Sequence, residues 1–264
     1  MSLFDSLRDL LPGTNRPKRR TPVAAKPRPA LPPPEAITID HAGVPLVVMF
    51  ERSAKARRVS LRVDQRSGRV RLVAPPRMAR DKALGFAHAQ AAWIHGRVLR
   101  QSPAVPFTDG AEIPLFGTPH VVRHRPDRRG TVWLEEGALH VAGHAEHLPR
   151  RLHDWLAGEL RARILPLAHA KAAGIGRKVT HITVRDTATQ WGSCARGGRL
   201  SFSSRLAFAP PEIVDYVVSH EVAHLVHADH SAQFWALTEQ LAGGDVAASR
   251  AWLRRNGERL MRLG

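Results

Sequence analysis

The stretch from Pro210 to His230 reads PPEIVDYVVSHEVAHLVHADH and predicts a buried helix. Proline is favoured at the first position of a helix, so Pro210 or Pro211 marks its start. Apolar side chains then occupy nearly every face, and they include Ile213, Val214, Val217, Val218, Val222 and Leu225. A helix that is apolar all round belongs in the core of a protein. We therefore expect the polar residues of this stretch to be held inside the fold.

His220, Glu221 and His224 form an H-E-x-x-H pattern on this helix. Histidines at positions i and i+4 lie one turn apart on one face, so both imidazoles can bind one metal ion. Glu221 points roughly 100° away around the helix, where it can bond the metal's water without taking a coordination position. Zinc lowers the pKa of such a water to about 7. Because burying these groups is costly unless they are coordinated, the pattern predicts one Zn²⁺ per chain, with Glu221 as general base.

A catalytic zinc also needs a third protein ligand and an open fourth position. His227 would stay on the same face if the helix continued, but three stacked imidazoles would fit tetrahedral geometry poorly. His230 lies six residues after His224, a spacing at which the chain leaves the helix before it returns to the metal. His227 then stands where that longer pattern has glycine. Ser231 is suited to cap the next helix and so to fix His230, and we expect His230 to be the third ligand.

Several further motifs flank this helix: Arg185-Asp186, Thr189-Gln190-Trp191-Gly192-Ser193-Cys194, Arg205-Leu206, Ala209-Pro210-Pro211, Asp215-Tyr216-Val217-Val218, His230-Ser231 and Phe234-Trp235. Together with the H-E-x-x-H pattern they resemble the YgjP-like zinc metallopeptidase family, which is related to the SprT-like and WLM metalloproteases. The resemblance is close over the last third of the chain and looser over the first half. Gln190 and Val222 replace the family's usual Arg and Leu. The resemblance implies a zincin-like peptidase with His220, His224 and His230 as metal ligands and Glu221 as catalytic residue.

Three neighbouring features have more than one interpretation. The segment from Trp191 to Cys194 could rim the cleft and accept a peptide as an added strand, or it could be a turn with Trp191 packed on the core. Cys194 could be a thiolate near the metal, although a small buried side chain is the commoner role for cysteine. Tyr216 lies one turn before His220 and could donate to a developing oxyanion, or it could be a core residue.

Upstream of these motifs, short strands alternate with two helical patterns. Alternation over Val59–Val63 predicts a strand that turns at 65–68 and pairs with Val70–Val73. Apolar residues at helical spacing predict helices over 78–100 and 149–173, the second with an internal proline at Pro166. Residues 46–50 form a short apolar run, and hairpin-like pieces are expected at 113–122 and at 132–134 with 139–141. Strands are expected at 181–184 and 199–202. The expected class is α+β, with a β-rich N-terminal part before a small zincin-like domain that holds the H-E-x-x-H helix.

The composition limits the organisation and the partners. The chain of 264 residues carries a formal charge of +17, part of it in a stretch rich in Pro, Lys and Arg at 12–34. Such a stretch buries too little apolar surface to fold, so we expect a disordered tail over 1–36, a β-rich region over 37–148 and a metallopeptidase domain over 149–264. No apolar run approaches the length of a membrane helix, and the start does not read as a signal peptide. One cysteine agrees with a reducing compartment, so we expect a cytoplasmic protein that has no membrane partner.

The favoured function is hydrolysis of a peptide or protein substrate. A zinc-activated water can also attack phosphorus, so a phosphohydrolase acting on a nucleotide is the first alternative. The second alternative is a protease recruited to nucleic acid by its basic charge. In the sequence the arginines are scattered, and few aromatic residues accompany them for base stacking. The oligomeric state and the identity of the substrate are left open by the sequence.

Overall fold

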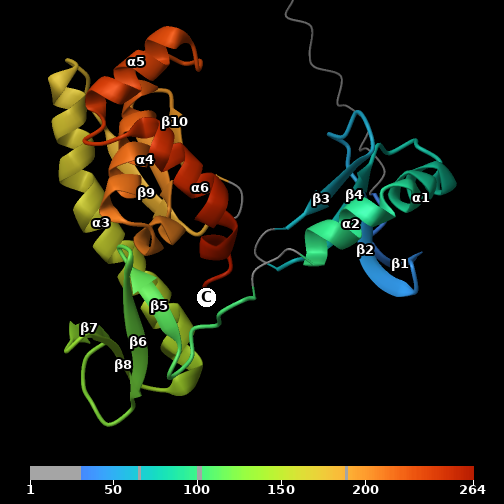
Figure 1. The fold of residues 1–264 in the computed structure, drawn as a ribbon, viewed down its shortest axis with the longest axis horizontal. Coiled ribbons are helices and arrows are strands. Elements are labelled where there is room, and N and C mark those ends of the chain that lie inside the picture. Colours follow the sequence, from blue (N-terminus) through green and yellow to red (C-terminus); the bar gives the residue numbers. More distant parts are fainter. Residues whose placement is uncertain (1–30, 65–66, 100–102, 188–189) are drawn as a thin grey trace, which may run out of the picture.

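The computed structural model describes residues 31–64, 67–99, 103–187 and 190–264 (Figure 1). Within these ranges, sheets dominate the first half and most of the helices follow, which confirms the mixed α+β class. The strands are β1 (Glu35–His41), β2 (Val44–Arg52), β3 (Ser60–Val63), β4 (Val70–Ala74), β5 (Glu112–Leu115), β6 (Thr118–Arg125), β7 (Val132–Glu135), β8 (Ala138–Ala142), β9 (His181–Arg185), β10 (Gly192–Ala195) and β11 (Arg199–Ser203). The helices are α1 (Arg80–Ala89), α2 (Ala91–Leu99), α3 (Leu148–Gly174), α4 (Pro211–Ala223), α5 (Ala232–Leu241) and α6 (Val246–Met261), with 3₁₀ turns η1 (Ala145–His147) and η2 (Ser204–Phe208).

The first sheet has the strand order β1-β2-β4-β3, and α1 and α2 pack against it. Strand β4 shows the alternation that the sequence predicted, because Val70, Leu72 and Ala74 are buried while Arg71 is exposed. Strand β3 pairs with β4 in antiparallel fashion, with Leu61 opposite Leu72. The buried residues of this sheet and of its two helices form one hydrophobic cluster.

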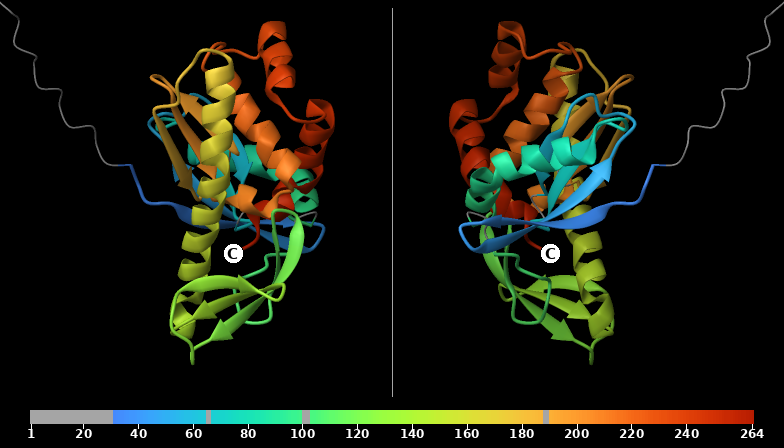
Figure 2. Two further views of the ribbon diagram at one scale, coloured as in Figure 1. Left: turned by 90° about the vertical axis from the view of Figure 1, so that its left-hand side faces the viewer. Right: turned by 90° about the vertical axis from the view of Figure 1, so that its right-hand side faces the viewer.

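A second, larger cluster is built around the long helix α3. The sheet β5-β6-β8-β7 packs on the first part of α3, and β9 and α4 pack further along it. Both views in Figure 2 show α3 extending from the green strands of that sheet to the orange strands and helix. Leu152, Leu156, Leu160 and Ile164 recur every four residues and are fully buried. Helix α3 continues through Pro166 to Gly174.

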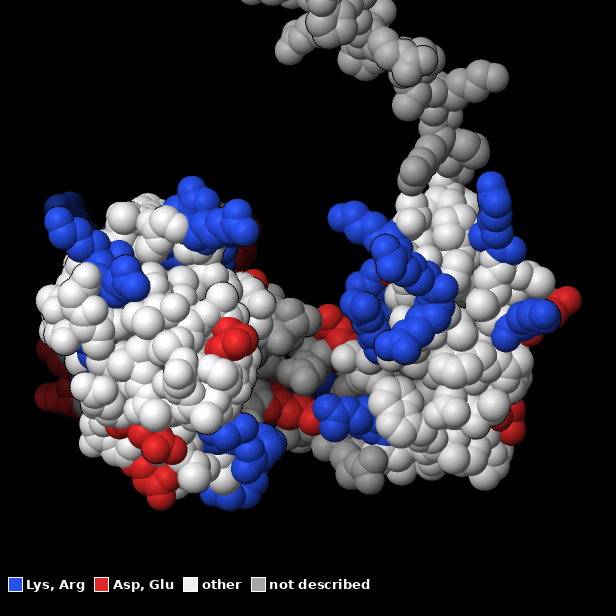
Figure 3. All heavy atoms as spheres, turned by 90° about the horizontal axis from the view of Figure 1, so that it is seen from above, with Lys and Arg blue, Asp and Glu red and all other residues white. Residues whose placement is uncertain are grey.

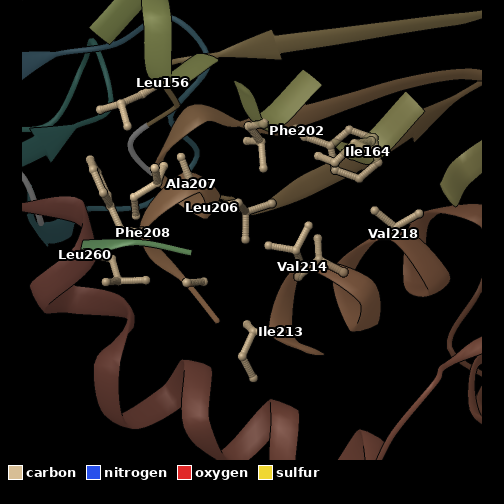
Figure 4. Close-up of a cluster of buried hydrophobic side chains, with 14 of the residues drawn as sticks. Leu156, Ile164, Phe202, Leu206, Ala207, Phe208, Ile213, Val214, Val218 and Leu260 are labelled. Carbon is tan, nitrogen blue, oxygen red and sulfur yellow. The ribbon is translucent and has the colours of Figure 1, made fainter. Parts of the chain in front are cut away.

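The centre of this cluster lies where α3, the sheet β10-β11-β9 and α4 meet (Figure 4). Phe202 of β11 and Leu206 and Phe208 of η2 point into it beside Val214 and Val218 of α4. Helix α4 is buried along most of its length, as its composition predicted. Its position is therefore fixed by packing on several sides.

Two details differ from the sequence expectations. The helix expected over 78–100 is two helices that meet at Gln90, whose φ of −103° and ψ of 11° are not helical. Nothing in the composition at Gln90 signals this break, since neither Gly nor Pro is present. Helix α6 was not expected, because its exposed face is rich in arginine.

Residues 1–30 of the expected basic tail lie outside the described residues, and residues 31–34 precede the first strand. The division expected at residue 149 stays a prediction. Among the described helices, none combines the length and the apolar character that a membrane span requires.

Candidate metal centre

Helix α4 carries the first part of the site and is anchored near its N-terminal end. Pro211 is its first residue, and Asp215 in its second turn is held by two neighbours. Lys171 Nζ of α3 lies 2.8 Å from Asp215 Oδ1, and the backbone N–H of Gly243 donates to Asp215 Oδ2 over 2.8 Å. These contacts tie the N-terminal half of α4 to α3 and to the chain after α5.

His220 and Glu221 lie in the last turn of α4, while His224 is the residue that ends it. The last residue of α4 is Ala223, so the second histidine of the H-E-x-x-H pattern is the C-cap and lies just outside the helix. His224 keeps helical angles (φ −65°, ψ −13°), and its N–H still donates to the His220 carbonyl over 3.3 Å. The two imidazoles consequently stay on one face, as the i and i+4 spacing requires.

His230 returns to this face through a tight turn after α4. The N–H groups of Val226 and His227 both donate to the carbonyl of Ala223 over 3.0 Å, which reverses the chain. Ser231 then caps α5, since its side chain accepts a hydrogen bond from the Phe234 N–H over 3.4 Å. The cap expected at Ser231 is confirmed.

The three histidines His220, His224 and His230 converge. Each offers one ring nitrogen, and these atoms all lie within 4.8 Å of one another. The Nε2 atoms of His220 and His230 are 3.2 Å apart. His227 does not join this group, and its carbonyl oxygen lies 2.9 Å from Nδ1 of His224. In the tautomer that donates from Nδ1, His224 keeps its Nε2 lone pair for a ligand, an arrangement common in metal-binding histidines.

Two aromatic residues of α5 pack around the three imidazoles. The Phe234 ring is fully buried, and its centroid lies 4.9, 4.5 and 4.8 Å from those of His220, His224 and His230. Trp235 lies 5.8 and 5.7 Å from His220 and His230, under the guanidinium of Arg250. Burial, reinforced by the two neighbouring histidines and Arg250, lowers the pKa of His220 to about 4. His220 is therefore a neutral imidazole at physiological pH, which is the form that binds metals.

Glu221 is 4% exposed and lies beside the histidine cluster. Burial raises the pKa of its carboxyl to about 8. The side chain is covered by Gly192 of β10, where an added Cβ would lie 2.6 Å from Glu221 Cγ and 2.7 Å from Cδ. This position in β10 has room for glycine alone unless Glu221 moves.

An open cleft of about 520 Å³ joins these groups. Residues 192–198 line one side of it, and His220, Glu221, His224 and His230 line the other. Strand β10 is an edge strand, since within the described residues it pairs only with β11. Trp191, just before β10, packs on the core and lies against Gly257 of α6. Both interpretations of this segment thus describe part of it, because the strand rims the cleft while the tryptophan is structural.

A comparison with protein families agrees with this geometry. The YgjP-like metallopeptidase domain matches residues 57–256, which is most of the chain. The chain belongs to the YgjP-like family. No curated protein and no solved structure matches it. Membership confirms the resemblance seen in the sequence, and a metallopeptidase domain implies a metal cofactor and peptidase activity.

The sequence of this YgjP-like chain left the roles of two further side chains, Cys194 and Tyr216, undecided. Cys194 lies half-buried in β10 and lines the cleft, but it is not part of the histidine cluster. Burial, and secondarily the charge of Glu221, raises the pKa of its thiol, so a thiolate is disfavoured. Tyr216 is 7% exposed, and its ring packs edge-on against His220 at 6.0 Å. It does not line the cleft, so its position is that of a core residue that supports His220.

Sequence reasoning missed two residues that shape this YgjP-like site. Gly192 stands inside a sequence motif, but its contact with Glu221 depends on how β10 packs against α4. Phe234 was recognised as an apolar residue of α5, but its contact with all three histidines needs the turn after α4.

Proposed function

We propose that this chain is a zinc-dependent peptidase of zincin-like architecture. His220, His224 and His230 would hold one zinc ion, and Glu221 would be the general base. The observation that carries the proposal is the convergence of three imidazole nitrogens within 4.8 Å, beside a buried carboxyl and an open cleft. Three nitrogen ligands with an open fourth position are the usual donor set of a catalytic zinc.

The donor groups fit such an ion. The Nε2 atoms of His220 and His230 lie 3.2 Å apart. In the tautomers that carry the proton on Nδ1, both present a lone pair to the same space, where a cation could be bound. His224 has its other nitrogen engaged by a backbone carbonyl, which orients the ring. When bound, zinc would polarise a carbonyl and lower the pKa of a coordinated water to about 7.

The protein's own groups would complete the reaction. The positive charge of a bound zinc ion would lower the pKa of the buried Glu221 carboxyl again. In its carboxylate form, Glu221 would accept the proton of the attacking water and deliver it to the departing amine nitrogen. Among the described residues β10 pairs on one side only, so its other edge could offer backbone N–H and C=O groups to a substrate in the cleft. An extended peptide could pair with this edge as an added strand, which would bring a scissile carbonyl to the histidine cluster.

The cleft favours a peptide over a nucleotide as substrate. Of the described residues that line it, Arg196 is the only arginine or lysine. Phosphoryl transfer generally relies on several cationic groups or metal ions around the phosphate. This observation supports the peptidase over the phosphohydrolase.

One experiment tests the proposal. The purified chain is incubated with a mixture of unstructured peptides and, separately, with nucleoside triphosphates, before and after chelation and after zinc is restored. We expect peptide cleavage that chelation abolishes and zinc restores. If nucleotides were hydrolysed and no peptide were cleaved, the site would be that of a phosphohydrolase. If peptide cleavage continued after the metal was fully removed, the metal-dependent mechanism would be excluded.

A further inference from the structure

A strongly basic hollow lies on the outer face of the first sheet, apart from the histidine cluster. It has a volume of about 560 Å³ and is lined by β2, β3, β4 and the loop between β2 and β3. Five cationic side chains line it, and we call them the arginine hollow: Lys55, Arg57, Arg58, Arg62 and Arg71. Figure 3 shows lysine and arginine side chains gathered on this part of the chain. Glu51 is the only carboxylate that the described part of the chain contributes to its lining.

The strand register places two of these cations directly opposite one another. Arg62 of β3 and Arg71 of β4 are paired positions of the antiparallel ladder, and both side chains are exposed. Like charges at such positions destabilise a sheet. Glu51 bonds Arg71 over 2.5 Å. Arg62 forms no ion pair with any described residue, so the repulsion at this pair is only partly offset.

The loop adds three more cations in a fixed position. The N–H of Ser53 donates to the carbonyl of Ala74 over 3.0 Å, and that of Ala56 donates to Ser53 over 3.0 Å. Arg52 anchors the base of the loop through the carbonyls of Pro75, Pro76 and Met78 at 3.2, 2.9 and 2.7 Å. These bonds hold the backbone that presents Lys55, Arg57 and Arg58. Within the part of the chain that the structure describes, none of those three side chains forms an ion pair.

We propose that the arginine hollow binds the phosphate backbone of double-stranded nucleic acid. Guanidinium groups bond phosphate oxygens in pairs, and four of the five cations are arginines. None of the described residues that line the hollow is aromatic, so these residues offer no stacking surface of the kind with which proteins hold single strands. Within the residues that the structure describes, its apolar lining is Ala56 and Val73, which is too little to insert into a membrane surface. The phosphate backbone of a duplex, bound through its charge and without contacts to the bases, fits this lining best.

This site does not depend on the proposed peptidase. The strands that line the hollow pack on one hydrophobic cluster, and the helices that carry the three histidines pack on the other. Each can therefore fail in an experiment without the other. If both hold, the hollow would concentrate the enzyme on nucleic acid, where bound proteins would be its substrates.

The test measures binding of a fluorescent duplex by the full chain over a range of salt concentrations. One duplex is DNA, a second is RNA of the same sequence, and zinc content and circular dichroism monitor the fold. The test variant is the double substitution Arg57→Gln and Arg62→Gln. The matched control is Arg123→Gln with Arg177→Gln, two exposed arginines outside the hollow. Both variants lose two charges, so a difference between them reports position rather than net charge.

We expect the hollow variant to bind about tenfold more weakly at low salt and its salt slope to fall by about 2, because each phosphate contact contributes about one unit. The control should keep affinity within about twofold of the parent. Equal losses in both variants would reduce the binding to net charge and overturn the proposal. Unchanged affinity in the hollow variant, or hollow-dependent binding to phosphatidylserine vesicles with none to duplexes, would also overturn it.

Discussion

Gly192 of β10 lies directly against the side chain of Glu221 on α4, although 29 positions separate them in the sequence. A methyl group on Gly192 would lie 2.6 Å from Glu221 Cγ, well inside the contact distance of two carbon atoms. The strand that rims the cleft thus also fixes the direction of the carboxyl. This contact connects the proposed substrate edge to the proposed general base.

The substitution Gly192→Ala tests this connection. The added methyl group would displace the Glu221 carboxyl while leaving the three histidines in place. A shift of about 1 Å in a catalytic group can lower turnover about a hundredfold. We expect kcat for peptide cleavage to fall by at least about tenfold, with zinc content unchanged.

Gly158→Ala provides the control for that substitution. Gly158 lies in α3, and no atom approaches within 4 Å of a Cβ built there. This variant should cleave peptides at the parental rate. A Gly192→Ala protein that is equally active would show that the contact with Glu221 has no role in positioning the base.

Replacing Glu221 with glutamine removes the base and retains its shape. We expect Glu221→Gln to bind zinc as the parent does but to cleave peptides at least about 10²-fold more slowly, since general base catalysis supplies an effect of that size. Zinc content by mass spectrometry and cleavage rate are measured on the same sample. If Glu221→Gln cleaved peptides at the parental rate, another group would have to be the general base.

The ion pair between Arg205 of η2 and Asp186, which follows β9, is expected to be important for stability. The Arg205 side chain is 2% exposed, and its Nε and Nη2 bond Asp186 over 2.9 and 3.2 Å. Removing Asp186 takes a paired carboxylate away from a buried guanidinium, which costs about 3 kcal/mol. We predict that Asp186→Ala lowers the free energy of urea unfolding by about this amount. Asp154→Ala, at a carboxylate that is 63% exposed, should have little effect, and equal losses in the two would contradict this assignment.

The local parts of the site were predictable from the sequence. The pairing of His220 with His224 follows from helical spacing alone, and the capping role of Ser231 follows from its residue type. His227 stayed open as a rival to His230, because the choice depends on the turn that starts at Ala223. That turn is made of backbone hydrogen bonds and carries no side-chain pattern.

Contacts between distant segments were not predictable. The β3 and β4 strands could be read from their alternation, yet the loop at 53–58 gathers its cations beside them only through the bonds of Ser53 and Arg52. In the sequence these arginines seemed scattered. The contact of Gly192 with Glu221 likewise requires β10 to pack on α4, which no periodicity encodes.

The metal content of three histidine variants tests the proposed centre most directly. The parent, His224→Ala, His230→Ala and His227→Ala are purified in parallel, loaded with zinc, dialysed and measured by mass spectrometry. We predict about one zinc per chain in the parent and in His227→Ala, and little in His224→Ala and His230→Ala, since each of these two loses one of three ligands. If His230→Ala kept the parental zinc content while His227→Ala lost its zinc, the proposed ligand set would be contradicted. If His224→Ala kept the parental zinc content, the zinc would have to be bound at another site.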